Sequence, residues 1–535
     1  IDISRGIPAF NIVGLPSTEV REARERVKSA VINAGYDFPN SRIVINLSPA
    51  DMRKEGSFLD LPMSVGILRK YINKKDSYLD ESIFVGELSL DGHLRKVKGI
   101  LPLVIGAKKE KFKRIFIPYD NFNESNFIDG IDIIPIKNLN ECINYLNGKE
   151  EINNNYKELE INNMTMDYNE DFQDVKGNYF VKRASEIAAA GNHNLMMVGP
   201  PGSGKTMIAK RIRTILPKLS KEEVIEISKI YSIAGMLDEK FGIVNQRPFR
   251  SPHHSTTIQS LVGGGYNSKP GEIVLAHRGV LFLDEIGEFH RNTLESLRQP
   301  MEDRYVNISR LKYSVKYPCN MLVIGAMNPC PCGFLGSKEK NCTCSETKIK
   351  RYLSKLSGPI VDRIDIQLNI SNVEYSEIYT NKKIEKSEVI RKRVEEARKI
   401  QLLRFEKEKI STNSEMNTSQ IKKYCILDKE SKSFLEMVYA KYKLNIRTYN
   451  NILKISRTIA DLSNKERIDV SCIAEAIQYK VDNKFYKKIE SALKETLFIG
   501  DGAFKVAIDT TISDYPILEW YPGERVEFVY QRDRI

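Results

Sequence analysis

The chain has 535 residues, of which 41% are hydrophobic and 28% charged, and this composition excludes a largely disordered chain. Lysine and arginine outnumber aspartate and glutamate by 82 to 70, a formal net charge of +12, which favours polyanionic partners. No stretch approaches the roughly 20 apolar residues of a membrane-spanning helix. Eight cysteines in so long a chain do not resemble a secreted disulfide scaffold. We expect a cytoplasmic protein of three or four domains with no membrane partner.

Residues 1–148 alternate strand-like runs with amphipathic helical patterns, which predicts a compact α/β domain. The expected strands are Phe10–Val13, Ile43–Leu47, Ile115–Pro118 and Ile131–Pro135, and the expected helices include Glu19–Ala34 and Leu61–Ile72. Residues 149–176 are rich in Asn, Glu and Asp, and we interpret them as a solvated linker.

From residue 177 the order helix, strand, Gly-rich turn, helix is typical of a nucleotide-binding α/β core with a parallel sheet. We assign residues 177–370 to this core and 371–483 to a helical lid, with helices over Ser387–Phe405, Ile446–Leu462 and Val470–Val481. Residues 484–535 change character again and form an extension of unknown role.

A Gly-rich loop follows the apolar strand Leu195–Val198 and precedes the helical run Met207–Leu216. It fits the pattern G-x-x-x-x-G-K-[ST], in which backbone N–H groups face phosphates, the lysine reaches the β and γ oxygens, and the hydroxyl coordinates Mg²⁺. The sequence therefore predicts ATP or GTP binding by Gly199, Pro200, Pro201, Gly202, Ser203, Gly204, Lys205 and Thr206.

The acidic half of such a site follows the apolar strand that begins at Gly279. Here Asp284 is expected to hold Mg²⁺ together with Thr206, and Glu285 to polarise the attacking water. An acid pair in this arrangement indicates hydrolysis rather than binding alone.

Two further polar groups are candidates whose roles the spacing leaves open. Asn328 follows the strand Met321–Ala326 and could sense the γ-phosphate, although Asn at a strand end is also a common turn former. Arg363 lies between Asp362 and Asp365, either as a surface ion pair or as an arginine finger that reaches a neighbouring subunit.

Several separate blocks together resemble the AAA+ ATPases of the magnesium-chelatase-like branch, and specifically the YifB/ComM family. The resemblance covers residues 1–483 and is carried by Phe10–Pro16, Asn46–Asp51, Asp60–Pro62, Phe249–His254, Gly263–Gly265, Met327–Gly333 and Gly358–Asp365. It implies ATP and Mg²⁺ as cofactors, a homo-hexameric ring, and ATP sites at subunit interfaces.

The resemblance also implies roles for individual residues. It makes Asn328 similar to sensor 1, Arg363 to the finger acting in trans, and Arg447 to the sensor 2 arginine, with Arg457 as the second choice. Members similar to ComM act as motors on single-stranded or branched DNA. The resemblance implies that loops within 233–278 and the helix Thr293–Glu302 face the DNA in the central channel of the ring.

The N-terminal block is similar to a Lon-protease C-terminal domain, through Val85–Gly92 and Val97–Leu101. Active proteases of that type need a serine nucleophile and a lysine base. Ser57 lies near the nucleophile position but out of register, and Leu101 occupies the expected lysine position. We therefore expect a non-proteolytic domain.

Three weaker patterns remain open. Cys330, Cys332, Cys342 and Cys344 form C-x-C pairs that either hold a structural zinc ion or remain free thiols. His253-His254 favours a structural or subunit-contact role over metal binding. The basic stretch Lys382–Lys409 is mixed with glutamate, which favours a solvated helix face over nucleic-acid contact.

The leading hypothesis is a hexameric ATPase that translocates on DNA. A protein-remodelling ATPase similar to the magnesium chelatase subunit is the alternative, and the N-terminal block argues against it. An ATP-dependent protease is disfavoured because the Ser–Lys pair is absent.

Overall fold

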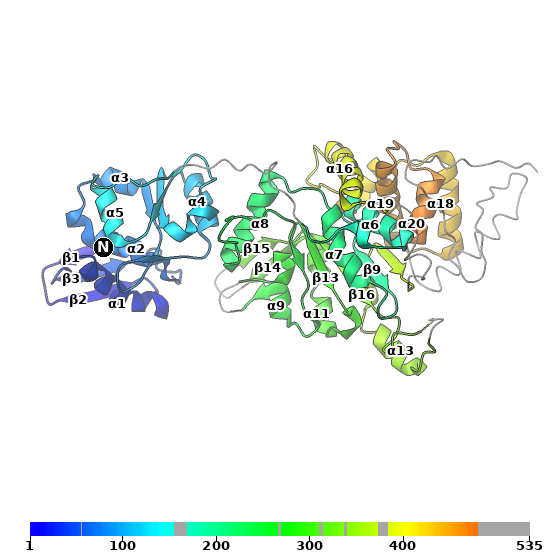
Figure 1. Cartoon of the computed structure of the whole chain (residues 1–535), viewed down its shortest axis with the longest axis horizontal. Coiled ribbons are helices and arrows are strands. Elements are labelled where there is room, and N and C mark those ends of the chain that lie inside the picture. The colour runs from blue at the N-terminus through cyan, green and yellow to red at the C-terminus, as the bar shows by residue number, and fades with distance from the viewer. Residues whose placement is uncertain are drawn as a thin grey trace, which may run out of the picture.

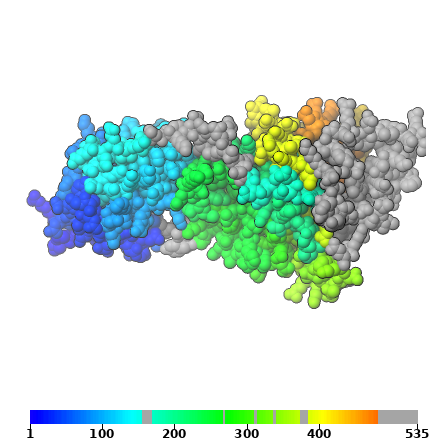
Figure 2. Space-filling view, viewed as in Figure 1, coloured from blue at the N-terminus to red at the C-terminus, as the bar shows by residue number. Residues whose placement is uncertain are grey.

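The computed structural model describes residues 1–54, 56–154, 168–265, 269–309, 314–335, 340–372 and 384–479. They form three units in a row, an N-terminal α/β domain, a central core around a parallel sheet, and a helical lid (Figure 1). The space-filling view shows the same sequence of units as an elongated body (Figure 2). The α/β class with a parallel core sheet and a helical lid is confirmed.

The N-terminal domain contains two small sheets and a hairpin. The first sheet has the order β1-β3-β2 and the second β4-β7-β8, with all second-sheet pairs parallel. The strands are β1 (Asp2–Ser4), β2 (Ala9–Val13), β3 (Arg42–Asn46), β4 (Ser82–Phe84), β5 (Glu87–Leu88), β6 (Leu94–Arg95), β7 (Arg114–Pro118) and β8 (Asp132–Ile136). The helices are α1 (Thr18–Asn33), α2 (Asp60–Ile67), α3 (Asp76–Asp80), α4 (Ile100–Lys109) and α5 (Leu139–Leu146).

The apolar periodicity of α1 explains how this domain packs. Val20, Val27 and Val31 recur at helical spacing and are buried against β3 and α2 in one hydrophobic core. The Ser17 side chain accepts a hydrogen bond from the Val20 N–H and so caps the helix start.

The central core has a five-stranded sheet with the order β10-β13-β16-β9-β17, and every pair in it is parallel. Its strands are β9 (Leu195–Val198), β10 (Phe249–Arg250), β13 (Val280–Leu283), β16 (Leu322–Met327) and β17 (Ile366–Asn369). The helices are α6 (Tyr179–Gly191), α7 (Lys205–Ile215), α8 (Lys221–Ala234), α9 (Ile258–Val262), α10 (Glu272–Leu275), α11 (Arg291–Glu295), α12 (Arg298–Asp303), α13 (Glu346–Leu353) and α14 (Gly358–Val361).

Two antiparallel hairpins extend from this core, β11 (Gly263–Gly264) with β12 (Lys269–Pro270), and β14 (Tyr305–Ser309) with β15 (Ser314–Pro318). They lie against each other, because a Cβ added at Gly263 would meet Ile308 Cδ1 at 2.8 Å. The second hairpin is inserted between β13 and β16 and was not predicted from the sequence.

The lid comprises α16 (Ser387–Arg404), α17 (Thr418–Tyr424), α18 (Lys429–Tyr442), α19 (Ile446–Leu462) and α20 (Val470–Gln478). Apolar residues of α16 and α19, such as Val394 and Ile455, share one continuous core with the helices α6 and α7. The Asp461 carboxylate accepts from Arg404 Nη1 at 2.8 Å, which ties α16 to α19 inside the lid.

Helix α8 joins the N-terminal domain to the core (Figure 1). Val224 and Ile227 of α8 share a hydrophobic cluster with Ile100 and Leu101 of α4. The Ser232 hydroxyl of the same helix donates to the buried Glu124 carboxylate at 2.6 Å. Burial raises the pKa of Glu124, opposed by the hydrogen bonds it accepts.

The expected linker over 149–176 is shorter at its C-terminal end. Phe172 and Val175 are buried in the core shared with α6 and α7, and the Phe172 N–H donates to Ser387 Oγ at 2.8 Å. The segment was interpreted as a linker because its composition is polar, although Phe172 and Val175 pack into the core. Residues 155–167, 373–383 and 480–535, which include the expected C-terminal extension, lie outside the described residues.

The single helix expected over Thr293–Glu302 is instead two short helices, α11 and α12. Pro300 explains the break, because its ring would clash with the carbonyl of Ser296 in a continuous helix and it has no N–H to donate. Pro300 lies in the first turn of α12, where a missing donor is tolerated.

We expect Phe172→Ala to lower the free energy of unfolding of the core by roughly 3–5 kcal/mol, because it empties a buried site. Urea unfolding of the full chain measures this change. Phe241→Ala removes an exposed ring of the same kind and should leave the midpoint unchanged. If both substitutions changed the free energy of unfolding equally and only slightly, residues 168–176 would belong to the solvated linker and not to the core.

Candidate nucleotide-binding site

The phosphate loop joins the end of β9 to the start of α7. Gly202 and Gly204 have φ angles of 83° and 84°, which glycine adopts without strain. A Cβ at Gly199 would meet the Ile370 carbonyl oxygen at 2.3 Å. The glycines therefore let the loop turn sharply beside β17 and place its backbone N–H groups at a helix N-terminus, where an anion is favoured.

Lys205 is the first residue of α7, and its side chain folds back over the loop. The buried Nζ donates to the carbonyl oxygens of Gly199 at 2.7 Å and Pro200 at 2.8 Å. Burial lowers the pKa of Lys205, whereas the negative charges of Asp284 and Glu285 oppose that shift. The ammonium is thus held at the mouth of the loop among oxygen acceptors, which phosphate oxygens could replace.

The acidic pair follows β13 at the same edge of the sheet. The Thr206 hydroxyl donates to Asp284 Oδ2 at 2.8 Å, so the two groups expected to hold Mg²⁺ are already adjacent. Hydroxyl and carboxylate oxygens are ligands that Mg²⁺ accepts. Glu285 adopts a left-handed conformation with φ of 48°, and its N–H donates to Asp284 Oδ1 at 2.9 Å.

Asn328 lies beside this pair because β16 is the neighbour of β9. Met327 pairs with Val198, and the Gly199 N–H donates to the Met327 carbonyl at 3.1 Å. The Asn328 amide oxygen is 3.3 Å from Lys205 Nζ. The structure therefore brings Lys205, Thr206, Asp284 and Asn328 together, with Glu285 next in the chain.

The arginine candidates lie elsewhere. Arg363 Nη1 donates to the Pro359 carbonyl at 2.7 Å, and the guanidinium forms an ion pair with Glu302 of α12. Arg447 is half-buried in the first turn of α19. Arg457 is only 2% exposed, and its guanidinium is bound by Asp461 and the Glu466 carbonyl. Arg457 therefore stabilises the lid interior, which favours Arg447 over it as a nucleotide contact.

The position of His254 beside Glu285 was not predicted from the sequence. Its Nδ1 is 3.8 Å from Glu285 Oε2, and its ring lies beside that of His253, tilted by 35° with centroids 4.0 Å apart. The loop that carries both histidines leaves β10, the neighbour of β13, at the same edge of the sheet. The adjacency of β10 and β13 places His254 near Glu285, but it can be used only once the order of the strands in the sheet is known.

The N-terminal domain holds no counterpart of a Ser–Lys pair among its described contacts. The Ser57 hydroxyl donates to the Glu87 carboxylate. Leu101, at the expected lysine position, is fully buried in α4. The candidate nucleophile Ser57 therefore faces a carboxylate rather than a lysine amine in the described part of the chain.

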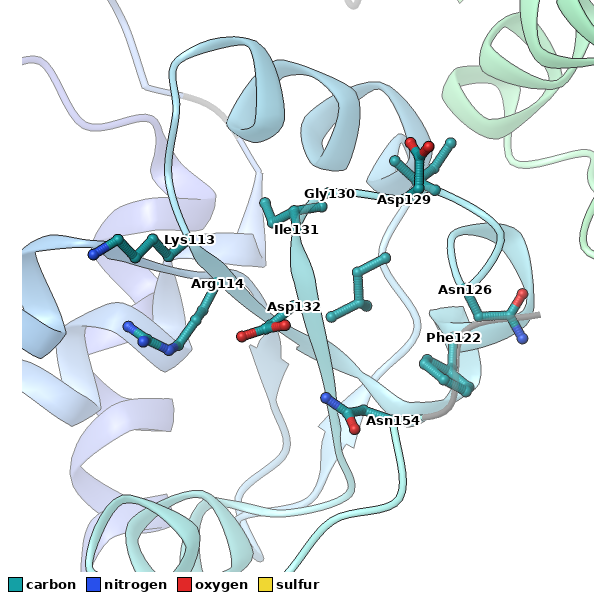
Figure 3. Close-up of a pocket in the computed structure, with 11 residues that line it drawn as sticks. Lys113, Arg114, Phe122, Asn126, Asp129, Gly130, Ile131, Asp132 and Asn154 are labelled. Carbon is teal, nitrogen blue, oxygen red and sulfur yellow. The ribbon is translucent and has the colours of Figure 1, made fainter. Parts of the chain in front are cut away.

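A hollow of about 470 Å³ in this domain lies between β7, β8 and the segment that carries Phe122 and Asn126 (Figure 3). Three of its four charged groups are already partnered, since Lys113 and Arg114 pair with Glu81 and Asp129 pairs with Lys108. The Arg114 guanidinium stacks on the Tyr78 ring. Nothing in these contacts indicates a reactive site.

Comparison with known proteins places the chain. Models described as magnesium chelatase, subunit ChlI; subunit ChlI of Mg-chelatase; and the ChlI C-terminal region match residues 171–378, 1–121 and 384–480. Competence protein ComM of Haemophilus influenzae is 38% identical over 496 residues, which are 92% of this chain and 96% of that protein. The chain belongs to the YifB/ComM family. YifB of Escherichia coli is 38% identical over 497 residues, with the same coverage.

The YifB/ComM family is a magnesium-chelatase-like branch of the AAA+ proteins and implies use of a nucleotide and Mg²⁺. The site geometry fits both. The link to Lon is weaker, because Lon protease 2 of Bacillus subtilis is 29% identical over 153 residues, 27% of either chain. Since a ChlI model covers residues 1–121, the N-terminal block does not by itself separate this chain from a chelatase subunit.

Within the part of the chain that the structure describes, no helix combines the length and apolar character needed to span a bilayer.

We expect Lys205→Ala to abolish ATP binding, because it removes the ammonium that faces the phosphates. We expect Glu285→Gln to bind ATP but to lower turnover by about 100-fold or more, because the amide is a poor base. Fluorescent-nucleotide binding and phosphate release measure the two effects.

The matched control is Lys210→Ala, which removes an exposed lysine from the same helix and should change neither quantity. Wild-type turnover by Glu285→Gln would contradict the role given to Glu285.

Proposed function

We propose that the protein is an ATP-hydrolysing motor that acts on DNA. The observation that carries the hydrolysis is the 2.8 Å contact between Thr206 and Asp284, with Lys205 and Asn328 beside it and Glu285 next in the chain. ATP hydrolysis needs a phosphate-binding loop, metal ligands and a base close together. The parallel strands β9, β13 and β16 bring these groups to one edge of the sheet.

Each residue has a distinct role in this proposal. Backbone N–H groups of the loop and the Lys205 ammonium bind and orient the phosphates. Thr206 and Asp284 hold Mg²⁺, which neutralises phosphate charge when bound. Glu285 accepts a proton from the attacking water, His254 helps to hold that carboxylate in place, and Asn328 orients the γ-phosphate.

Assembly into a homo-hexamer completes the site. The described partners of the Arg363 side chain lie on α12 and α14, not in the phosphate loop of its own chain. A finger that acts in trans needs such a location, with Glu302 as its partner until a neighbouring subunit presents phosphate. Arg447 supplies a second cation from the lid.

The two neighbouring hairpins are the proposed DNA contact. Exposed Lys316 of β15 lies over the Tyr305 ring of β14, with Nζ 3.6 Å from the ring centroid. The sequence between these strands includes Arg310 and Lys312, although residues 310–313 lie outside the described part. Cations interleaved with an aromatic ring suit a phosphate backbone and stacked bases. The name of the relative ComM, a competence protein, is consistent with a DNA substrate.

A protein partner is the alternative, because models of the magnesium chelatase subunit match most of the chain. Proteolysis is disfavoured by the Ser57–Glu87 contact. Branch migration, recombination and DNA uptake are processes that a DNA motor of this kind could serve.

We expect single-stranded or forked DNA to stimulate ATP hydrolysis several-fold at low salt. The stimulation should decline steeply as salt rises, because DNA binding releases counterions. Lys316→Ala should reduce it, whereas Lys392→Ala, which removes an exposed lysine of α16, should not. ATPase assays with and without DNA measure these effects.

ATP hydrolysis indifferent to DNA, in a preparation that is hexameric by light scattering, would contradict the DNA proposal. It would leave the ATPase proposal intact and favour a protein partner.

A further inference from the structure

Four cysteines gather between β16 and α13. Cys330 and Cys332 follow Asn328 closely, and Cys342 and Cys344 precede α13. Although nine residues lie between Cys332 and Cys342 in the chain, the four sulfur atoms lie within 4.8 Å of one another. No other group of three or more histidine, cysteine or acidic side chains converges in this way among the described residues.

The distances between the sulfurs suit ligands of a single ion. Cys330 Sγ is 3.3 Å from Cys332 Sγ and 3.6 Å from Cys342 Sγ, and the Cys332–Cys342 separation is also 3.6 Å. All four are free thiols. Sulfur atoms at the corners of a tetrahedron with metal bonds of about 2.3 Å lie about 3.8 Å apart.

The surrounding backbone is shaped like a ligand loop. Gly333 follows Cys332 with a φ of 84°, and its N–H donates to the Cys330 carbonyl at 3.0 Å. Backbone N–H groups of Phe334 and Thr343 both donate to the Cys332 sulfur. Such hydrogen bonds to the sulfur are the usual outer support of thiolate metal sites, since they stabilise the negative charge.

We propose that Cys330, Cys332, Cys342 and Cys344 bind one structural zinc ion. Four thiolates exclude Mg²⁺ and Ca²⁺, which prefer oxygen. A four-iron cluster would hold its thiolates farther apart than these sulfurs lie. Four protein ligands close the coordination shell, so the ion has no open position for catalysis.

The position of the site explains what the ion does. A Cβ at Gly333 would meet Pro201 Cδ at 2.5 Å, so the cysteine loop rests directly on the phosphate loop. Downstream, the ring of Tyr352 on α13 packs so closely on Gly287 that a Cβ there would meet Tyr352 Cζ at 2.6 Å. Zinc therefore holds the cysteine loop at Gly333 and the following helix α13 against the two halves of the nucleotide site. Figure 2 shows the lobe around α13 projecting from the core.

The inference stands apart from the proposed DNA function, because it concerns only the integrity of this loop. The test is the metal content of the full chain, purified under reducing conditions without chelators and measured by inductively coupled plasma mass spectrometry. We expect about one zinc per chain. The double variant Cys342→Ser/Cys344→Ser should lose at least about nine-tenths of it.

Cys425→Ala is the matched control, since it removes a buried lid cysteine outside the cluster and should retain the zinc. If the double variant does not fold, a mercurial thiol reagent added to the wild-type protein should still release one zinc per chain, detected with a chromogenic chelator.

Wild-type protein with fewer than about one zinc per ten chains would overturn the proposal, and so would iron in place of zinc. Full zinc in a folded double variant would also overturn it, because the ion would then lie elsewhere.

Discussion

A parallel register of three strands holds the nucleotide site together. Leu283 of β13 pairs with Gly325 of β16, and Met327 of β16 pairs with Val198 of β9. The residues that follow these strands therefore emerge at one edge, where Thr206 and Asp284 come within 2.8 Å. Gly325 permits this packing, because a Cβ there would meet Met196 Sδ at 2.8 Å. A side chain at Gly325 would displace the Met196 thioether that packs against it.

Helix α8 connects this edge to the N-terminal domain. On one side its apolar residues pack on α4. On the other, Glu223 and Glu226 pair with Arg247 at 3.0 Å and Arg278 at 3.2 Å, next to the strands of the core. Such partly buried ion pairs fix geometry more than they add stability. The N-terminal domain is thus attached to a helix of the core.

The local parts of the site could be predicted from the sequence. The phosphate loop and the acidic pair each occupy a short stretch after an apolar strand, so their spacing suffices, and Asn328 follows the same logic. The positions of His254 and of the β14–β15 hairpin could not be found this way, because they depend on which strands are neighbours. Phe172 was missed because two apolar residues in a polar segment carry no periodic signal. The choice between Arg447 and Arg457 needed the buried partners of Arg457.

The central claim is that each active site is shared between two subunits, with Lys205 from one and Arg363 from the next. The most direct test mixes Lys205→Ala protein with Arg363→Ala protein, each inactive alone, under conditions that allow subunits to exchange. Random assembly at equal amounts should place an intact phosphate loop opposite an intact arginine at about one interface in four, and restore about that fraction of wild-type ATPase activity. No recovery in mixed rings, confirmed by subunit exchange of labelled chains, would contradict a shared site and assign Arg363 to its own chain.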